Sequence, residues 1–191
     1  MESVEYTYGK HTNGKITKRD DSIVGIRTGK FCMIEPESRL IPAMENENIV
    51  RQHPECVTSY LFGHYNTDIF DAFGDTKNRV RPGMVIVGND VRIGYDVIIK
   101  SGVTIGNGAV VSSYSRLYED VLPYSIVHGN PTEHEKFRFN PEQIAQLEII
   151  KWWDWEDEKI NRFLPLLCGA DIDAFIEAAL ADEIVSVKNI D

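Results

Sequence analysis

The stretch that decides the fold runs from Val87 to Leu122 and reads VGNDVR, IGYDVI, IKSGVT, IGNGAV, VSSYSR, LYEDVL. An aliphatic residue recurs at every sixth position, and a second, generally smaller residue recurs four positions after it. The first set is Val87, Ile93, Ile99, Ile105, Val111 and Leu117, and the second set is Val91, Val97, Val103, Ala109, Ser115 and Val121. A period of six fits neither an amphipathic helix nor an ordinary strand. It is typical of a parallel β-helix, in which both sets fill the interior and three hexapeptides make one triangular coil.

Glycine follows the phased aliphatic residue in three of these hexapeptides, at Gly88, Gly94 and Gly106. Each glycine comes where the chain must turn from one short strand to the next. Because glycine adopts positive φ without steric cost, we expect these residues to form tight corners in that conformation.

An earlier block carries the same rhythm more weakly. Thr28, Ile34 and Leu40 lie six residues apart, and Cys32 and Ser38 occupy the smaller interior position. The intervening chain, from about residue 43 to residue 81, has no six-residue phase. A long non-repetitive excursion from a repeat protein is usually a functional loop. The sequence therefore predicts one β-helix interrupted by this excursion.

Composition excludes several classes of function. The chain has 191 residues and a formal net charge of −10, without the clustered cations that nucleic-acid binding needs. No stretch has the roughly 20 apolar residues of a membrane span, and the first residues do not resemble a signal peptide. The three cysteines, Cys32, Cys56 and Cys168, are far apart and odd in number. We expect reduced thiols in a cytoplasmic protein.

The rhythm ends at Asn130-Pro131, after which the pattern becomes helical. Asn140 is suited to cap a helix with Pro141 at its first position, and further helices are expected at about 157–167 and after Asp171. Trp152, Trp153 and Trp155 are expected to pin these helices to the coils. The apolar face of the first helix is expected to contain Ile144, Leu147 and Ile150. The buried apolar face of the third helix is expected to contain Ile172, Phe175, Ile176 and Leu180.

Several motifs along the chain, taken in order, resemble those of one protein family. GNDVRIG, LPYSIVHGNP, KFRF, KWWDW and FLPLLC resemble the hexapeptide-repeat acyltransferases, in the branch of type B chloramphenicol and streptogramin acetyltransferases with their sugar O-acetyltransferase relatives. Upstream, TGKFCMIEPE resembles a coil of that family, and VTSYLF at 57–62 resembles its loop segment. The resemblance covers residues from about Ser22 to Glu177.

The resemblance implies an all-β solenoid with a helical C-terminus, specifically a left-handed parallel β-helix. The domain boundaries expected are 1–138 for the β-helix with its excursion at about 43–81, and 139–191 for helices packed on the same domain. It also implies a homotrimer with active sites between subunits, and acetyl-CoA as acyl donor lying beside the coils. No metal is expected, since no hexapeptide contains a histidine.

The resemblance places the catalytic histidine in the excursion. The thioester is already activated, so the reaction needs only a group that takes the proton of the attacking hydroxyl, and a neutral imidazole suits this role. His53 is the candidate general base, although one alignment places Gln52 there and Pro54 replaces the family's arginine. His64 is the second choice, and a loop histidine without a role is the alternative.

The same resemblance assigns acceptor and coenzyme contacts. Tyr60 lies in the loop segment, and Arg92 replaces a tryptophan of the acceptor pocket, where it either binds a hydroxyl-rich or anionic acceptor or faces solvent. For the coenzyme, the expected contacts are Gly102, Ala109, Ser112 and Ser113 beside the pantetheine arm and Lys136 and Arg138 at the phosphates. Glu133 and Phe137 replace other basic positions.

These features predict an acetyl-CoA-dependent O-acetyltransferase. Arg92 and the polar excursion favour a hydroxyl of a sugar or other small metabolite, with an antibiotic of the chloramphenicol or streptogramin type as the alternative acceptor. The rival from another class is a catalytically silent trimeric scaffold or ligand-binding protein, because fold alone does not establish activity.

Overall fold

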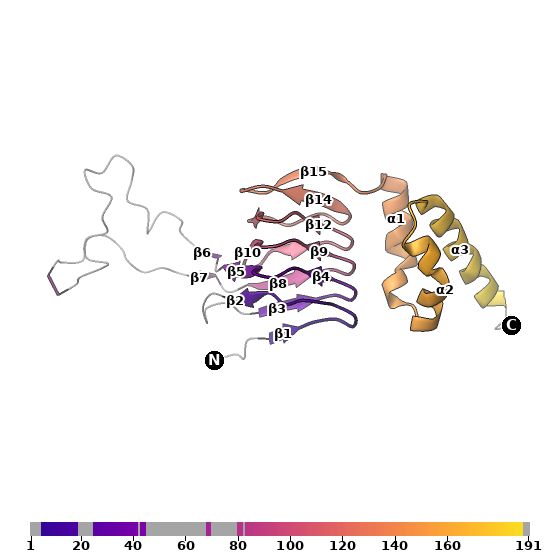
Figure 1. Cartoon of the computed structure of the whole chain (residues 1–191), viewed down its shortest axis with the longest axis horizontal. Coiled ribbons are helices and arrows are strands. Elements are labelled where there is room, and N and C mark those ends of the chain that lie inside the picture. The colour runs from indigo at the N-terminus through magenta and orange to yellow at the C-terminus, as the bar shows by residue number, and fades with distance from the viewer. Residues whose placement is uncertain are drawn as a thin grey trace.

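A computed structural model of the chain describes residues 5–18, 25–41, 43–44, 68–69, 80–81 and 83–188. In these residues, short strands stack in three sheets around a shared interior, and the C-terminal helices lie at one side of the stack (Figure 1). His53, His64, Tyr60 and Cys56 lie outside the described residues, whereas Cys32 and Cys168 are both free thiols.

The chain visits the three sheets in rotation. The first sheet contains β1 (Glu5–Thr7), β3 (Gly25–Thr28), β8 (Met84–Val87) and β11 (Thr104–Ile105). The second contains β4 (Met33–Ile34), β9 (Arg92–Ile93), β12 (Val110–Val111), β14 (Ser125–His128) and β15 (Glu133–Phe137). The third contains β2 (Thr17–Lys18), β5 (Arg39–Ile41), β10 (Ile98–Lys100) and β13 (Arg116–Leu117).

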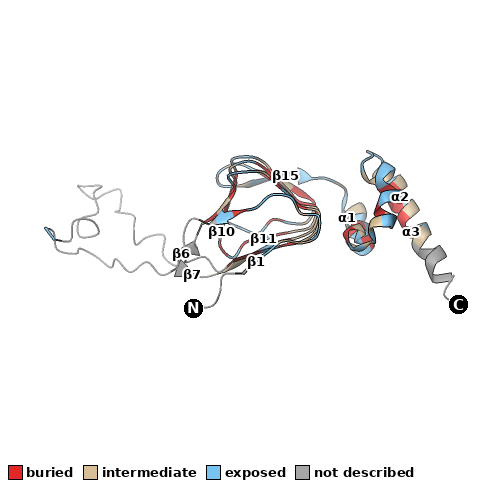
Figure 2. Cartoon of the chain, turned by 60° about the horizontal axis from the view of Figure 1, so that its bottom comes forward, coloured by how far each residue is buried: buried red, intermediate tan, exposed pale blue. Residues whose placement is uncertain are grey.

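Strand register confirms that three hexapeptides make one coil. Val87 pairs with Ile105, Ile93 with Val111 and Ile99 with Leu117, each pair parallel and 18 residues apart. Both interior sets predicted from the six-residue period are buried, with Ile93, Ile99 and Ile105 completely inaccessible. Figure 2 shows buried residues recurring along the stacked coils. In the earlier block, Thr28, Cys32, Ile34, Ser38 and Leu40 are also buried, as predicted.

The predicted reason for the corner glycines was wrong. None of Gly88, Gly94 and Gly106 has positive φ. A Cβ atom on Gly94 would lie 2.6 Å from the backbone nitrogen of Ser113, and one on Gly106 would lie 2.5 Å from that of Pro123. The glycines are needed because consecutive coils approach too closely for a side chain, not because the backbone is left-handed.

Left-handed backbone instead occurs two residues after each of these glycines, at Asp90, Asp96 and Gly108. At the corner between the first and second sheets, Phe31, Asp90, Gly108 and Tyr124 all have positive φ. We call this the helix-facing corner, because the C-terminal helices pack beside it (Figure 1). Glu37, Asp96 and Tyr114 have positive φ at the corner between the second and third sheets.

A strand that the sequence analysis did not predict follows Pro131. β15 pairs antiparallel with β14, with Ile126 opposite Lys136. All five of its residues are exposed, so it has no buried apolar periodicity from which it could be recognised. At the side of the stack away from the C-terminal helices, β6 (Ala43–Met44) and β7 (Val80–Arg81) pair antiparallel, so the excursion leaves and rejoins the coils at one place (Figure 1).

The helical segment agrees with its capping and spacing signals. It contains α1 (Pro141–Ile150), a short 3-10 helix (Trp152–Asp154), α2 (Asp157–Leu167) and α3 (Ile172–Lys188). Asn140 Oδ1 accepts a hydrogen bond from Gln143 N at 2.8 Å, and Gln143 Oε1 accepts one from Asn140 N at 3.1 Å. This reciprocal pair caps α1 as predicted. Among the described residues, no helix has the length and apolar content to cross a membrane.

Aromatic and polar contacts join the helices to the helix-facing corner. The Phe31 and Trp152 ring centroids are 4.9 Å apart, and Trp153 is buried in the cluster formed by the helices and Tyr124. Asn107 Nδ2 donates to a Glu148 carboxylate oxygen at 2.9 Å. Two of the three tryptophans therefore pack where the sequence analysis expected aromatic docking.

This docking predicts a sharp difference between two adjacent residues of α1. Ile150 is 3% exposed and Ile149 is 71% exposed. We expect Ile150→Ala to lower the free energy of unfolding by about 2–5 kcal/mol, because it leaves a cavity. Ile149→Ala is the matched control and should change it by less than about 0.5 kcal/mol. Chemical denaturation measures both, and equal effects would contradict the observed packing.

An ion pair lies at the same junction. Arg138 Nη1 is 3.3 Å from Asp90 Oδ2 and donates to the carbonyl oxygen of Gly108 at 2.6 Å. Burial raises the pKa of Asp90 above its ordinary value, and the Arg138 charge opposes that increase. Since the folded pKa exceeds the unfolded one, this carboxyl contributes stability that is present below the unfolded pKa and lost as pH rises through the folded pKa.

We therefore predict that Arg138→Gln raises the pKa of Asp90 further, because the opposing cation is removed. A titration of the Asp90 carboxyl carbon by NMR measures this directly. Arg162→Gln, which removes an exposed cation on α2, should leave the Asp90 titration unchanged. If Arg138→Gln lowers the pKa of Asp90, the assigned electrostatic role of Arg138 is wrong.

Candidate active site and coenzyme groove

The outer face of the second sheet brings two predicted site residues, Arg92 and Lys136, into one row. Strand register places Met33 beside Arg92, Arg92 beside Val110, Val110 beside Ile126 and Ile126 beside Lys136. Met33, Arg92 and Lys136 are exposed, while Val110 and Ile126 are partly buried. Neighbouring strands are about 4.8 Å apart, so the row runs along the coil axis with an apolar middle between two cationic residues whose strands are roughly 14 Å apart.

Arg92 lies on the outside of its hexapeptide. Its side chain is 59% exposed, and Nη2 is 3.0 Å from Glu35 Oε1. The guanidinium group is therefore already paired with a carboxylate from the adjacent coil. An acceptor contact by Arg92 would have to share or replace Glu35.

Ser112 and Ser113 lie at the end of β12, beside this row. The Ser112 backbone nitrogen donates to the Val127 carbonyl oxygen at 3.0 Å, so that group is used by the next coil. Ser113 is exposed, and its Oγ accepts a hydrogen bond from Tyr95 N at 3.1 Å. Among the described residues, no acceptor is seen for the Ser113 hydroxyl hydrogen, which can therefore bind a ligand.

Two exposed tyrosines next to Ser113 were missed by the sequence analysis. Tyr95 and Tyr114 pack edge to face, with ring centroids 5.7 Å apart. They are 39% and 66% exposed. The sequence did contain a pattern that could have predicted this pair. A tyrosine stands at nearly the same place in two hexapeptides that are one coil apart, IGYDVI and VSSYSR. Together the rings make an aromatic wall at this corner.

Ala109 and Gly102 lie elsewhere. Ala109 begins the second-sheet part of its coil at the helix-facing corner, where its carbonyl oxygen accepts from Arg92 N at 2.9 Å and its side chain is fully buried. Gly102 has a φ of +89° at the corner between the third and first sheets. A Cβ there would meet only the Gly83 Cα, at 4.0 Å, so a ligand has room to approach its backbone.

Lys136 and Arg138 have different surroundings. Lys136 is 65% exposed, and its nearest carboxylate, Glu135, is 4.0 Å away. Arg138 is held by Asp90 and Gly108 and lies over the Phe139 ring, with its guanidinium carbon 5.2 Å from the ring centroid. Of these two predicted phosphate contacts, Lys136 is the more exposed and has the longer ion-pair distance, 4.0 Å to Glu135 against 3.3 Å from Arg138 to Asp90.

The structure thus gathers Arg92, Ser112, Ser113 and Lys136 along one face and its edge, and it separates them from Gly102 and Arg138 within a single chain. The predicted base His53 and the predicted acceptor contact Tyr60 lie outside the described residues. In the part of the chain that the structure describes, no group of three or more His, Cys, Asp or Glu side chains is arranged to hold a metal ion.

Comparison with known proteins identifies the family. Residues 84–118 match the model of the bacterial transferase hexapeptide (six repeats). The chain is 44% identical over 152 residues to a chloramphenicol acetyltransferase of Morganella morganii, covering 80% of this chain and 70% of that protein. It is 35% identical over 147 residues to a probable macrolide acetyltransferase of Lysinibacillus sphaericus, covering 73% of this chain and 74% of that protein.

A solved structure, the hexapeptide-repeat-containing acetyltransferase VCA0836 of Vibrio cholerae, covers 71% of this chain and 64% of its own, with 22% identity and a TM-score of 0.47. That similarity is too low to carry a functional argument. This chain covers more than two thirds of the length of each of the two sequence relatives, at 44% and 35% identity. The family model matches hexapeptides that form the coils. The chain therefore belongs to the hexapeptide-repeat acyltransferases, in the branch that contains the chloramphenicol acetyltransferases.

Proposed function

We propose that this protein transfers an acetyl group from acetyl-CoA to a hydroxyl group of a small molecule, with His53 as general base. The observation that carries the proposal is the 44% identity with a chloramphenicol acetyltransferase over 152 residues. Membership of an acyltransferase family also weighs against the rival interpretation, a catalytically silent scaffold, although only an activity measurement separates the two.

The row on the second sheet suits the coenzyme. Acetyl-CoA carries anionic phosphates at one end and an uncharged, flexible pantetheine arm. Lys136, exposed at the edge of the sheet, provides the cation for a phosphate, and the partly buried Val110 and Ile126 provide an apolar track beside it. The Ser113 hydroxyl and the open backbone at Gly102 are further contacts that we assign to the pantetheine arm.

The proposed reaction needs one proton acceptor. The acceptor hydroxyl attacks the thioester carbonyl while its proton passes to the imidazole. The carbon–sulfur bond then breaks, and the imidazolium returns that proton to the CoA thiolate, which leaves as the free thiol. His53 is proposed as that imidazole, with His64 as the second choice. Both belong to the excursion whose ends meet at β6 and β7.

The proposed acceptor changes once the geometry is considered. Arg92 favoured a hydroxyl-rich acceptor on sequence grounds, but its guanidinium group pairs with Glu35 at 3.0 Å. The relatives are named for chloramphenicol and macrolides, and Tyr95 and Tyr114 form an exposed aromatic wall. We therefore place an aromatic or apolar alcohol of the chloramphenicol type first and a sugar second.

We also propose the assembly that the family resemblance implies. The coils would be left-handed, residues 1–138 and 139–191 would form one domain, and three chains would associate in the cytoplasm with active sites between them. Such an arrangement would let Gly102 of one subunit approach the second-sheet row of another, which a single chain does not do. Light scattering and sedimentation of the purified chain measure the number of subunits.

Calorimetric titration with acetyl-CoA, followed by an assay of thiol release with chloramphenicol or maltose, tests the function. We expect acetyl-CoA binding in the micromolar range and thiol release that depends on the acceptor. Lys136→Gln should weaken coenzyme binding, whereas Lys15→Gln, which removes an exposed cation far along the coils, should not. Absence of acetyl-CoA binding by a folded protein would favour the scaffold interpretation.

Removal of the proposed base should affect chemistry and not coenzyme binding. We expect His53→Ala to reduce turnover by roughly a hundredfold or more, with the acetyl-CoA dissociation constant nearly unchanged. His64→Ala is the matched comparison, because it removes a histidine from the same excursion. A large loss in His64→Ala with an unchanged rate in His53→Ala would transfer the catalytic role to His64.

A further inference from the structure

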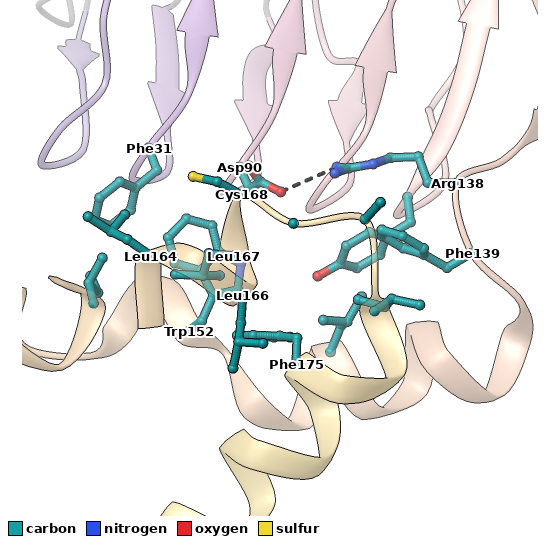
Figure 3. Close-up of a pocket in the computed structure, with 16 residues that line it drawn as sticks. Phe31, Asp90, Arg138, Phe139, Trp152, Leu164, Leu166, Leu167, Cys168 and Phe175 are labelled. Carbon is teal, nitrogen blue, oxygen red and sulfur yellow. Dashed lines mark hydrogen bonds and ion pairs between the residues drawn. The ribbon is translucent and has the colours of Figure 1, made fainter. Parts of the chain in front are cut away.

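A cavity of about 400 Å³ lies between the helix-facing corner and the C-terminal helices, apart from the second-sheet row (Figure 3). Most of its wall is apolar and comes from both parts of the chain. Phe31 contributes from the coils, and Trp152, Leu164, Leu166, Leu167 and Phe175 contribute from the helices. Its volume is within the range of small-molecule binding sites, whereas gaps left by ordinary packing are rarely larger than a water molecule.

One part of the wall is polar. Asp90 and Arg138 both line the cavity, with their charged groups 3.3 Å apart, so the pair brings no net charge to it (Figure 3). Asp90 has left-handed backbone at the helix-facing corner. Arg138 follows β15 and closes the other side of the pair.

Tyr124 supplies an unused hydrogen-bonding group in the same wall. It lines the cavity and is 1% exposed, yet its hydroxyl has no hydrogen-bond partner among the described residues. Burial raises the pKa of Tyr124 above its ordinary value, so the hydroxyl remains protonated and is a donor at neutral pH. A buried hydroxyl without a partner is costly, and most such groups in folded proteins are satisfied.

We propose that this cavity binds a small, uncharged, mainly apolar molecule that carries a hydroxyl group, and that Tyr124 donates a hydrogen bond to that group. The aromatic and leucine side chains take the apolar body of the ligand. The neutralised Asp90–Arg138 pair disfavours a charged ligand, because no unbalanced charge offsets the loss of its hydration. The cavity is separate from the second-sheet row, since Arg92, Ser113 and Lys136 do not line it. Arg138, a predicted phosphate contact, does line it and is paired there with Asp90.

Indan-2-ol and its parent hydrocarbon indane are suitable probes, because they share one shape and differ only in the hydroxyl group. Calorimetry with the full chain should show that both bind and that indan-2-ol binds more tightly, by roughly three- to tenfold, as expected for one hydrogen bond. Tyr124→Phe keeps the ring and removes the hydroxyl. It should reduce the affinity for indan-2-ol to that for indane and leave the affinity for indane unchanged.

A second variant tests the location. Leu166→Trp fills the cavity and should abolish binding of both probes, and thermal unfolding verifies that this variant is folded. The proposal is overturned if neither probe binds the wild-type chain, or if both bind a folded Leu166→Trp variant as tightly as wild type. It is also overturned if Tyr124→Phe weakens the two probes equally, since the hydroxyl would then have no direct role.

Discussion

The direct contact of each coil with the next is the constraint on which the rest of this structure depends. Parallel strands at about 4.8 Å leave no space for a side chain where consecutive corners meet. A Cβ at Gly88 would lie 2.7 Å from the Asn107 nitrogen, and one at Gly29 would lie 2.6 Å from the Gly88 carbonyl oxygen. The need for aliphatic residues in the interior therefore sets the hexapeptide period, and glycine is added at those corners where the backbones touch.

The same close stacking produces a ladder of asparagine contacts that ends at the helices. Asn89 Oδ1 accepts from Lys30 N at 2.8 Å, and Asn107 Oδ1 accepts from Asn89 N at 2.8 Å. Asn107 then donates to Glu148 of α1. The helix-facing corner thus continues the hydrogen bonding of the coils into the helical segment. Three of its left-handed residues, Phe31, Asp90 and Tyr124, line the cavity between the coils and the helices.

Sequence patterns predicted those features that depend on periodicity or on local capping. The interior positions, α1 with its Asn140 cap, and α2 at Asp157–Leu167 are all confirmed, because each depends on neighbours at fixed spacing. β15 was missed because pairing with β14, rather than any burial pattern, makes it a strand. The partners of Arg138 were missed for a related reason, since Asp90 and Gly108 are distant in sequence. His53 and Tyr60 remain predictions.

The distribution of cations decides how this chain can hold an anionic coenzyme. Arg92 is paired with Glu35, Arg138 with Asp90 and Lys30 with Asp154, so three cations near the coil surface already have carboxylate partners. The chain also carries a net charge of −10, which opposes the approach of phosphates over long distances. Lys136 alone cannot supply strong electrostatic attraction at an exposed site, where ionic contacts contribute little. In the placement that we propose for acetyl-CoA, we therefore expect most of the coenzyme affinity to come from the uncharged pantetheine arm against the apolar middle of the second sheet, and less of it from charge at the end of the coils.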